Sequence, residues 1–137
     1  MKNIALLLEY DGSAYSGWQF QPNAISIQEA IETSLSSCYK QPVSIIGAGR
    51  TDAGVHAIGQ VANFQISHAS IPLDKLPEAI NSKLPMDIRV LAAAEVNMDF
   101  HSRFSAIARE YIYNLSTVYS VFDSRFSTFC KYPIDEK

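Results

Sequence analysis

A glycine-rich turn at residues 47–57 holds the side chains best suited to chemistry. It reads Gly-Ala-Gly-Arg-Thr-Asp-Ala-Gly-Val-His-Ala and lies between two segments with the sequence of strands. Asp52 supplies a carboxylate, which can serve as a nucleophile or a general base. Arg50 lies two positions earlier, so in an extended chain both side chains leave the same face, where the guanidinium can keep the carboxylate ionised and contact a phosphate. We therefore predict a catalytic role, as a nucleophile, for Asp52.

The same turn allows a simpler interpretation. An exposed turn with a local Arg-Asp ion pair is common in proteins and contributes little to stability. Two familiar phosphate-binding loops are excluded, because a Walker loop requires a lysine that this turn lacks, and because both it and a dinucleotide-binding loop lead into a helix. Here the turn leads into the strand-like residues 59–66. The turn alone therefore does not identify a ligand.

The size and composition of the chain are those of an ordinary folded protein. Its 137 residues, 47% of them hydrophobic, are enough for one domain with a buried core. The net charge of −3 argues against a strongly basic nucleic-acid-binding protein, since a phosphate backbone is usually met by clustered lysine and arginine. Arginines that lie near turns can still form a local positive site in a cleft. The charge therefore lowers the expectation of an RNA substrate without excluding it.

The amino-terminal segment and the cysteines indicate a cytoplasmic protein. Residues 4–8 are apolar but too few to cross a membrane, and Glu9 and Asp11 close the segment, so neither a signal peptide nor a membrane helix is expected. Cys38 and Cys130 are far apart and match neither a disulfide framework nor a metal-binding motif. We predict a cytoplasmic protein with no membrane contact and no metal.

Hydrophobic periodicity and turn residues divide the chain into strands and helices. Ser26 and Glu29 fit a helix-capping box, and apolar residues at intervals of three and four follow as far as about Tyr39. Pro77 is tolerable in the first turn of a second helix, and Pro85 ends that helix. This order predicts an α+β domain with a ferredoxin-like split β-α-β antiparallel sheet, helices on one face and an added strand. The expected strands are 3–10, 43–46, 60–66, 88–96 and 110–115, and the expected helices are 26–39 and 74–83.

Several segments along the chain match one known family in residues, order and spacing. They are Tyr10-Asp11-Gly12, Gly17-Trp18-Gln19, the turn at 47–57, Phe100-His101-Ser102-Arg103-Phe104-Ser105-Ala106 and Arg109-Glu110-Tyr111-Ile112-Tyr113. Together they strongly resemble the TruA family of tRNA pseudouridine synthases. The resemblance covers essentially the whole chain and outweighs the objection from charge.

The resemblance implies roles for residues in the turn and in the last two segments. It makes Asp52 the essential nucleophile or general base, Arg50 its neighbour in an RNA-facing cleft, and Tyr111 the aromatic contact to the target uracil. Arg103 and Arg109 lie beside the presumed cleft, where they either contact phosphates or are plain surface residues.

Other residues in these segments have structural interpretations. Trp18 is interpreted as an anchor for its own loop rather than as a base-binding residue. The three histidines have no partners at a recognisable spacing, so none is assigned to proton transfer. Tyr113 is interpreted as an ordinary strand aromatic.

Pseudouridine formation sets clear chemical requirements. The N1–C1′ bond of uridine breaks, the uracil turns over, and C5 bonds to C1′ without loss of the free base. A carboxylate can attack the sugar or remove a proton from it, and the sequence leaves both routes open. The base must leave the RNA stack and be held in a pocket, where Tyr111 can lie against its face. No redox or group-transfer step occurs, so the resemblance implies no organic cofactor and no metal.

The length of the chain departs from the family pattern. Members are roughly twice as long, and their second half supplies the other wall of the cleft, so residues 1–137 are expected to form a single domain equivalent to the amino-terminal half. We expect such a fragment to be weak or inactive alone, and the intact protein to act as a homodimer on the anticodon stem-loop of tRNA. The alternative is a non-catalytic RNA-binding module with a ferredoxin-like sheet, in which Asp52 is structural and Tyr111 stacks on any accessible base.

Overall fold

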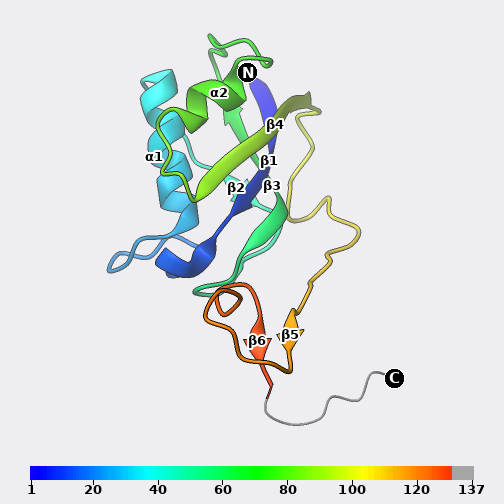
Figure 1. Cartoon of the computed structure of the whole chain (residues 1–137). Coiled ribbons are helices and arrows are strands. Elements are labelled where there is room, and N and C mark those ends of the chain that lie inside the picture. The colour runs from blue at the N-terminus through cyan, green and yellow to red at the C-terminus, as the bar shows by residue number, and fades with distance from the viewer. Residues whose placement is uncertain (131–137) are drawn as a thin grey trace. The chain divides into compact units, whose positions relative to one another are not determined.

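The chain forms two compact units, Met1–Ile107 and Ala108–Lys137. A computed structural model describes residues 1–130 (Figure 1). The first unit holds a four-stranded sheet with the strand order β2-β3-β1-β4 and two α-helices. Its elements are β1 (Lys2–Tyr10), the short 3₁₀ helix η1 (Gly12–Ala14), α1 (Ile27–Tyr39), β2 (Ile46–Gly47), β3 (Ala57–Ile66), α2 (Leu76–Asn81) and β4 (Ile88–Val96).

The sheet has the predicted ferredoxin-like topology. Strand β1 lies in the centre and pairs antiparallel with β3 on one side and β4 on the other, and β2 pairs antiparallel with the outer side of β3. Each helix connects two strands that are separated in the sheet by one antiparallel strand, which defines the split β-α-β arrangement. The predicted α+β class and four-stranded antiparallel core are therefore confirmed.

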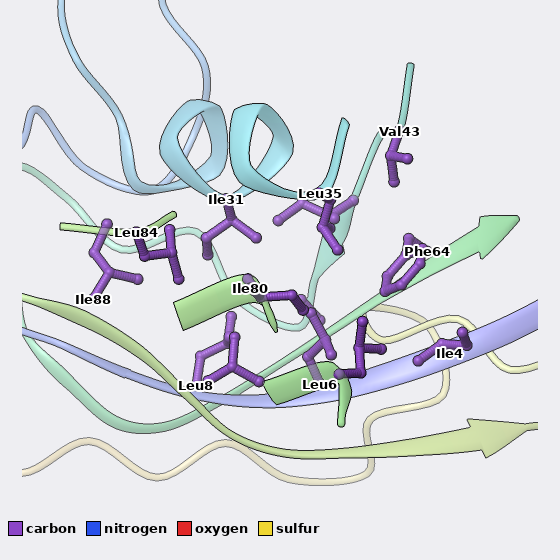
Figure 2. Close-up of a cluster of buried hydrophobic side chains, with 14 of the residues drawn as sticks. Ile4, Leu6, Leu8, Ile31, Leu35, Val43, Phe64, Ile80, Leu84 and Ile88 are labelled. Carbon is purple, nitrogen blue, oxygen red and sulfur yellow. The ribbon is translucent and has the colours of Figure 1, made fainter. Parts of the chain in front are cut away.

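The hydrophobic core lies between the helices and one face of the sheet. Ile4, Leu6 and Leu8 stand at alternate positions of β1, point to this face and are at most 1% exposed. Helix α1 buries Ile31 and Leu35, which are one turn apart, as the sequence predicted. Figure 2 shows these side chains meeting between α1 and the sheet, with Ile80 of α2 beside them.

The first helix begins at the predicted cap. The side-chain oxygen of Ser26 accepts a hydrogen bond of 3.1 Å from the backbone N–H of Glu29, which satisfies one of the donors left open at the start of a helix. The second helix is shorter than the predicted 74–83. It forms over Leu76–Asn81. Arg89 of β4 donates hydrogen bonds to the carbonyl of Asn81, the last residue of the helix, and to that of Pro85 beyond it.

Strand β2 begins later than the sequence predicted. The expected strand covered 43–46, whereas the structure has β2 at Ile46–Gly47. The backbone N–H of Val43 donates to the Ser36 hydroxyl at 3.0 Å, and that of Ile45 donates to a Glu32 carboxylate oxygen at 2.8 Å. Side chains of α1 satisfy these donors, so residues 43–45 bond to the helix and do not pair with β3.

The second unit holds a small parallel sheet of β5 (Leu115–Ser116) and β6 (Thr128–Phe129). The sequence predicted an added strand at 110–115, but 110–114 is not a strand and only Leu115 falls within β5. Alternation of side chains marks a segment that could be a strand, yet a strand also needs a neighbour for its backbone hydrogen bonds. Within residues 1–130, the pairing partner of β5 is β6.

Candidate active site

The residues around Asp52 form a tight turn between β2 and β3. The backbone N–H of Val55 donates to the carbonyl of Asp52 at 3.1 Å, and Gly54 has a φ of 80°. Ala53 does not have a positive φ, so the turn is of type II, which places a residue of left-handed conformation at its third position. The side chain of Asp52 is exposed and forms no hydrogen bond or ion pair with residues 1–130. Its carboxylate is therefore available to an incoming ligand.

Arg50 and Asp52 do not form the ion pair that the sequence predicted. Both side chains are exposed, and the structure places no contact within 4.0 Å between the guanidinium and the carboxylate. The prediction assumed an extended chain, whereas Asp52 opens a turn and the alternation of a strand does not apply there. An exposed pair would also gain little in water, so nothing compels it to form.

The loop that follows β1 holds the turn in place through hydrogen bonds. The backbone N–H of Trp18 donates to the carbonyl of Thr51 at 2.9 Å, and the N–H of Gly54 donates to the carbonyl of Tyr15 at 3.3 Å. The hydroxyls of Tyr10 and Thr51 are hydrogen-bonded at 2.8 Å. Backbone and side-chain bonds thus fix the residues on both sides of Asp52, although its own carboxylate is unrestrained.

Two glycines and one tryptophan let these loops approach closely. A β-carbon on Gly12 would overlap the carbonyl oxygen of Val55, and one on Gly47 would lie 2.6 Å from the Trp18 ring. These positions need glycine because the Val55 carbonyl and the Trp18 ring, respectively, fill the space that a side chain would occupy. Trp18 is 3% exposed and packs in the core, which supports its interpretation as an anchor of the loop.

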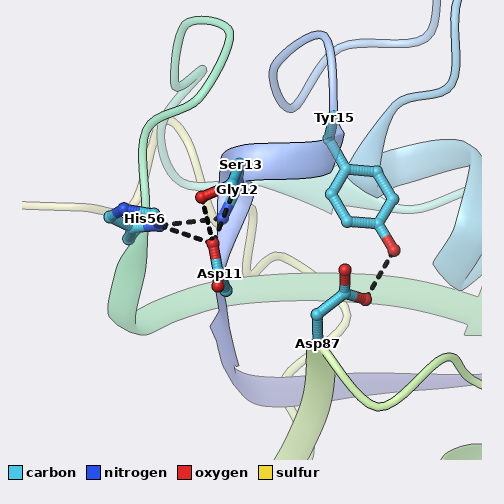
Figure 3. A network of polar contacts seen from close by, with 6 residues as sticks. All are labelled: Asp11, Gly12, Ser13, Tyr15, His56 and Asp87. Carbon is cyan, nitrogen blue, oxygen red and sulfur yellow. Dashed lines mark hydrogen bonds and ion pairs between the residues drawn. The ribbon is translucent and has the colours of Figure 1, made fainter. Parts of the chain in front are cut away.

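His56 has a structural partner that sequence spacing did not reveal. Its Nδ1 accepts a hydrogen bond of 2.9 Å from the backbone N–H of Gly12 and lies 3.2 Å from a carboxylate oxygen of Asp11 (Figure 3). The two bonded residues are 44 positions apart, so no local motif could have indicated the contact.

A second polar contact beside this loop joins Tyr15 to the residue before β4. The Tyr15 hydroxyl donates to a carboxylate oxygen of Asp87 at 2.7 Å (Figure 3). Burial raises the pKa of the Tyr15 phenol above its ordinary value, and the hydrogen bond to Asp87 and the negative charges of Asp87 and Asp11 raise it further. The folded chain therefore holds this proton at a pH at which the unfolded chain releases it.

The raised pKa of Tyr15 predicts a specific loss of stability in alkali. Unfolding releases the phenolic proton above about pH 10, so the free energy of unfolding falls as the pH rises from there towards the pKa of the folded state. Tyr15→Phe removes this contribution, and we expect its stability to decline less steeply than that of the unaltered chain. Urea denaturation at several values between about pH 9 and pH 11 measures both slopes. Identical slopes would contradict the assignment.

The predicted site residues belong to different units of the chain. Asp52, Arg50 and Arg103 lie in the first unit, and all three are exposed. Arg109 and Tyr111 lie in the second unit and are also exposed, Tyr111 to 63%. Their approach to Asp52 stays a prediction. Within residues 1–130, no group of three or more histidine, cysteine, aspartate or glutamate side chains could hold a metal ion, and no helix is long and apolar enough to cross a bilayer.

Comparison with known sequences identifies the family. The family model described as tRNA pseudouridine synthase matches residues 6–105, a range that contains the Asp52 turn and the loop behind it. The chain belongs to the tRNA pseudouridine synthase family. The predicted resemblance is thereby confirmed.

Individual relatives give the same result. Proteins named tRNA pseudouridine synthase A from Thermoanaerobacter sp. (strain X514) and Chlamydia muridarum are 47% and 52% identical to the chain over 82% and 84% of its length. The protein of that name from Brachyspira hyodysenteriae is 41% identical over the full chain. The matches cover 46%, 44% and 56% of these relatives, so this member of the tRNA pseudouridine synthase family spans about half their length.

Proposed function

We propose that the intact gene product containing this chain isomerises uridine to pseudouridine in tRNA, with Asp52 as the catalytic carboxylate. The observation that supports this most directly is the exposed Asp52 side chain on a turn whose backbone is held on both sides. A group that reacts with substrate must be accessible, and its backbone must be held still to keep its position. The family match over residues 6–105 supports this reaction and this class of substrate.

The proposed reaction uses the uridine itself as both donor and acceptor. The bond from N1 to C1′ breaks, the detached uracil turns over, and a bond forms from C5 to C1′. The proton on C5 is lost to solvent, and N1 takes up a proton, so the product has the composition of the uridine. Asp52 either attacks C1′ and later leaves, or removes a proton from the sugar and returns it. Both routes balance without an oxidant, a reductant or a second substrate.

The remaining predicted residues are proposed to hold the RNA. Arg50 and Arg103 are exposed cations on the same unit as Asp52, and a guanidinium can form two hydrogen bonds to a phosphate. We propose that Arg109 contacts the RNA in the same way. The exposed ring of Tyr111 is proposed to lie against the uracil after the base has left the stack.

The length of the relatives supports a larger assembly. Since the chain covers 46% of the Thermoanaerobacter protein, we propose that residues 1–137 are the amino-terminal half of the enzyme and that the other half completes the cleft and much of its basic surface. The intact enzyme is proposed to be a cytoplasmic homodimer that acts on the anticodon stem-loop.

Tritium release tests this function. tRNA transcribed with uridine carrying tritium at C5 is incubated with the intact gene product and, separately, with the 137-residue chain. We expect the intact product to release tritium to water in proportion to the pseudouridine formed, and the chain alone to release little. No release by the intact product would refute the proposed reaction. Full turnover by the chain alone would refute its role as half of a site.

A further inference from the structure

A buried polar cluster lies on the face of the sheet that the helices do not cover. It consists of Asn3 of β1, Asn63 of β3 and Ser102, which are 0%, 1% and 2% exposed. Residues next to these on both strands, including Ile4 and Phe64, point to the opposite face and form the core under the helices. The cluster is therefore separate from the hydrophobic core and belongs to the other face.

Two amide side chains connect this face to the segment after β4. The side-chain oxygen of Asn63 accepts hydrogen bonds from the backbone N–H and the hydroxyl of Ser102, at 2.8 Å and 2.6 Å. The Asn63 amide group donates to the side-chain oxygen of Asn3 at 3.0 Å. Asn3 in turn donates to the carbonyls of Asn97 and Phe100, both at 2.9 Å. Each hydrogen bond of this network joins the two asparagines to each other or joins one of them to a residue within 97–102.

Stability alone does not account for such a cluster. Buried amides and hydroxyls lose their hydration, and a fully bonded network only restores what burial removes, whereas apolar side chains would stabilise the same contact without that requirement. The network instead determines the position of residues 97–102, since all of its hydrogen bonds form together in only one placement of that segment. Residues 97–102 are thereby fixed against the sheet in a single register.

Arg103 follows directly from the anchored end of this segment. Its α-carbon is one peptide unit, about 3.8 Å, from that of Ser102, so fixing Ser102 fixes the base of the arginine side chain. The Arg103 guanidinium carbon lies 5.7 Å from the centre of the Phe104 ring, which stacks on His101 with ring centres 4.3 Å apart. The turn is closed by a hydrogen bond of 2.7 Å from the N–H of Ser105 to the carbonyl of His101. A rigid base and an aromatic surface together restrict where the guanidinium points.

We infer that Asn63 is a positioning residue for Arg103, acting through Ser102 to hold the guanidinium where a phosphate of the bound RNA meets it. This inference rests on the proposed function, in which Arg103 contacts the RNA. Asn63 itself is buried and touches no substrate, so its effect on binding is transmitted through the segment at 97–102.

Binding of unmodified tRNA by the intact gene product at several salt concentrations tests the inference. We expect Asn63→Ala and Arg103→Gln each to weaken binding by about tenfold, the size of one lost charge-assisted hydrogen bond. We also expect each to reduce the slope of log K against log salt by about one, because one phosphate contact is lost. The double variant should bind no more weakly than Arg103→Gln alone. In Asn63→Ala the isomerisation rate at saturating tRNA should stay within about twofold of the unaltered rate, which separates positioning from chemistry.

Ser34→Ala is the matched control. Ser34 is 2% exposed, and its hydroxyl donates to the carbonyl of Ile80 at 2.9 Å on the helix side of the sheet. This variant removes one buried polar group and should lower the free energy of unfolding without changing the salt slope. If Asn63→Ala does not fold, Ser102→Ala replaces it, since that variant keeps the backbone bond to Asn63 and should reduce affinity in the same direction by a smaller factor.

Two results would overturn the inference. One is an unchanged salt slope in folded Asn63→Ala or Ser102→Ala protein. The other is a double variant whose loss of affinity is the product of the separate losses, which would mean that Asn63 and Arg103 act independently. Tritium release by the unaltered protein measures the proposed function separately, so either result can be told apart from a failure of that function.

Discussion

Asp52→Asn is expected to lower the rate of uridine isomerisation by the intact gene product by about a thousandfold or more. An amide has the shape of the carboxylate, but it can neither attack C1′ as an anion nor accept a proton at neutral pH. The Asp52 side chain forms no hydrogen bond or ion pair within residues 1–130, so the substitution should change the free energy of unfolding by less than about 0.5 kcal/mol. Tritium release under single-turnover conditions measures the rate.

Asp74→Asn is the matched control for this variant. Asp74 is also exposed and precedes α2, so the substitution makes the same change of charge away from the turn. Its rate should equal that of the unaltered protein.

Affinity for tRNA should be retained in Asp52→Asn. Normal turnover by Asp52→Asn would eliminate it as the catalytic residue, and loss of tRNA binding in a protein that never isomerises uridine would favour the RNA-binding module instead.

Gly12→Ala is expected to have the largest effect on the structure of the site. An added β-carbon would overlap the carbonyl oxygen of Val55, and Val55 also donates its N–H to Asp52. Backbone cannot move aside as the end of a long side chain can, so either the loop after β1 or the Asp52 turn must shift. We expect a loss of about 2 kcal/mol in the free energy of unfolding, as overpacking produces, and a fall in isomerisation rate of about a hundredfold.

Gly59→Ala provides the comparison for Gly12→Ala. Its added β-carbon would meet only a Leu7 methyl at 3.9 Å, an ordinary contact, and Gly59 lies within β3. This variant should be as stable as the unaltered chain or slightly more stable, because alanine loses less backbone entropy than glycine on folding. Urea denaturation and single-turnover rates on both variants test the contrast. Equal stability and activity in the two would show that the close approach of the loops is unimportant.

The elements that could be predicted from the sequence are those defined by local signals. The start of α1 follows from a Ser26 side chain that reaches only three residues along the chain. The strand at 88–96 coincides with β4, and residues 3–10 lie within β1, since apolar runs bounded by turn residues needed no distant information. The type and order of these elements were sufficient to predict the ferredoxin-like sheet.

The features that were missed depend on contacts between distant parts of the chain. The β2 strand is short because Glu32 of α1 binds the N–H of Ile45, and no spacing rule connects those two positions. The role of His56 likewise comes from Gly12, a residue of the other loop. The position of Asp52 could be predicted from residue types in the turn, but its missing ion pair with Arg50 could not, because the prediction needed the backbone conformation of the turn.

The packing of Trp18 against Gly47 has a practical consequence for following the site in solution. Trp18 is the only tryptophan in the sequence, its side chain is 3% exposed, and its ring centre lies 6.2 Å from that of Tyr10, which bonds to Thr51 in the turn. Intrinsic fluorescence excited near the red edge of indole absorption therefore comes from one place, next to the turn that holds Asp52. If the turn moved away from Trp18, water would reach the indole ring and its emission maximum would shift to longer wavelength. The position of the turn can therefore be followed in solution without an added label.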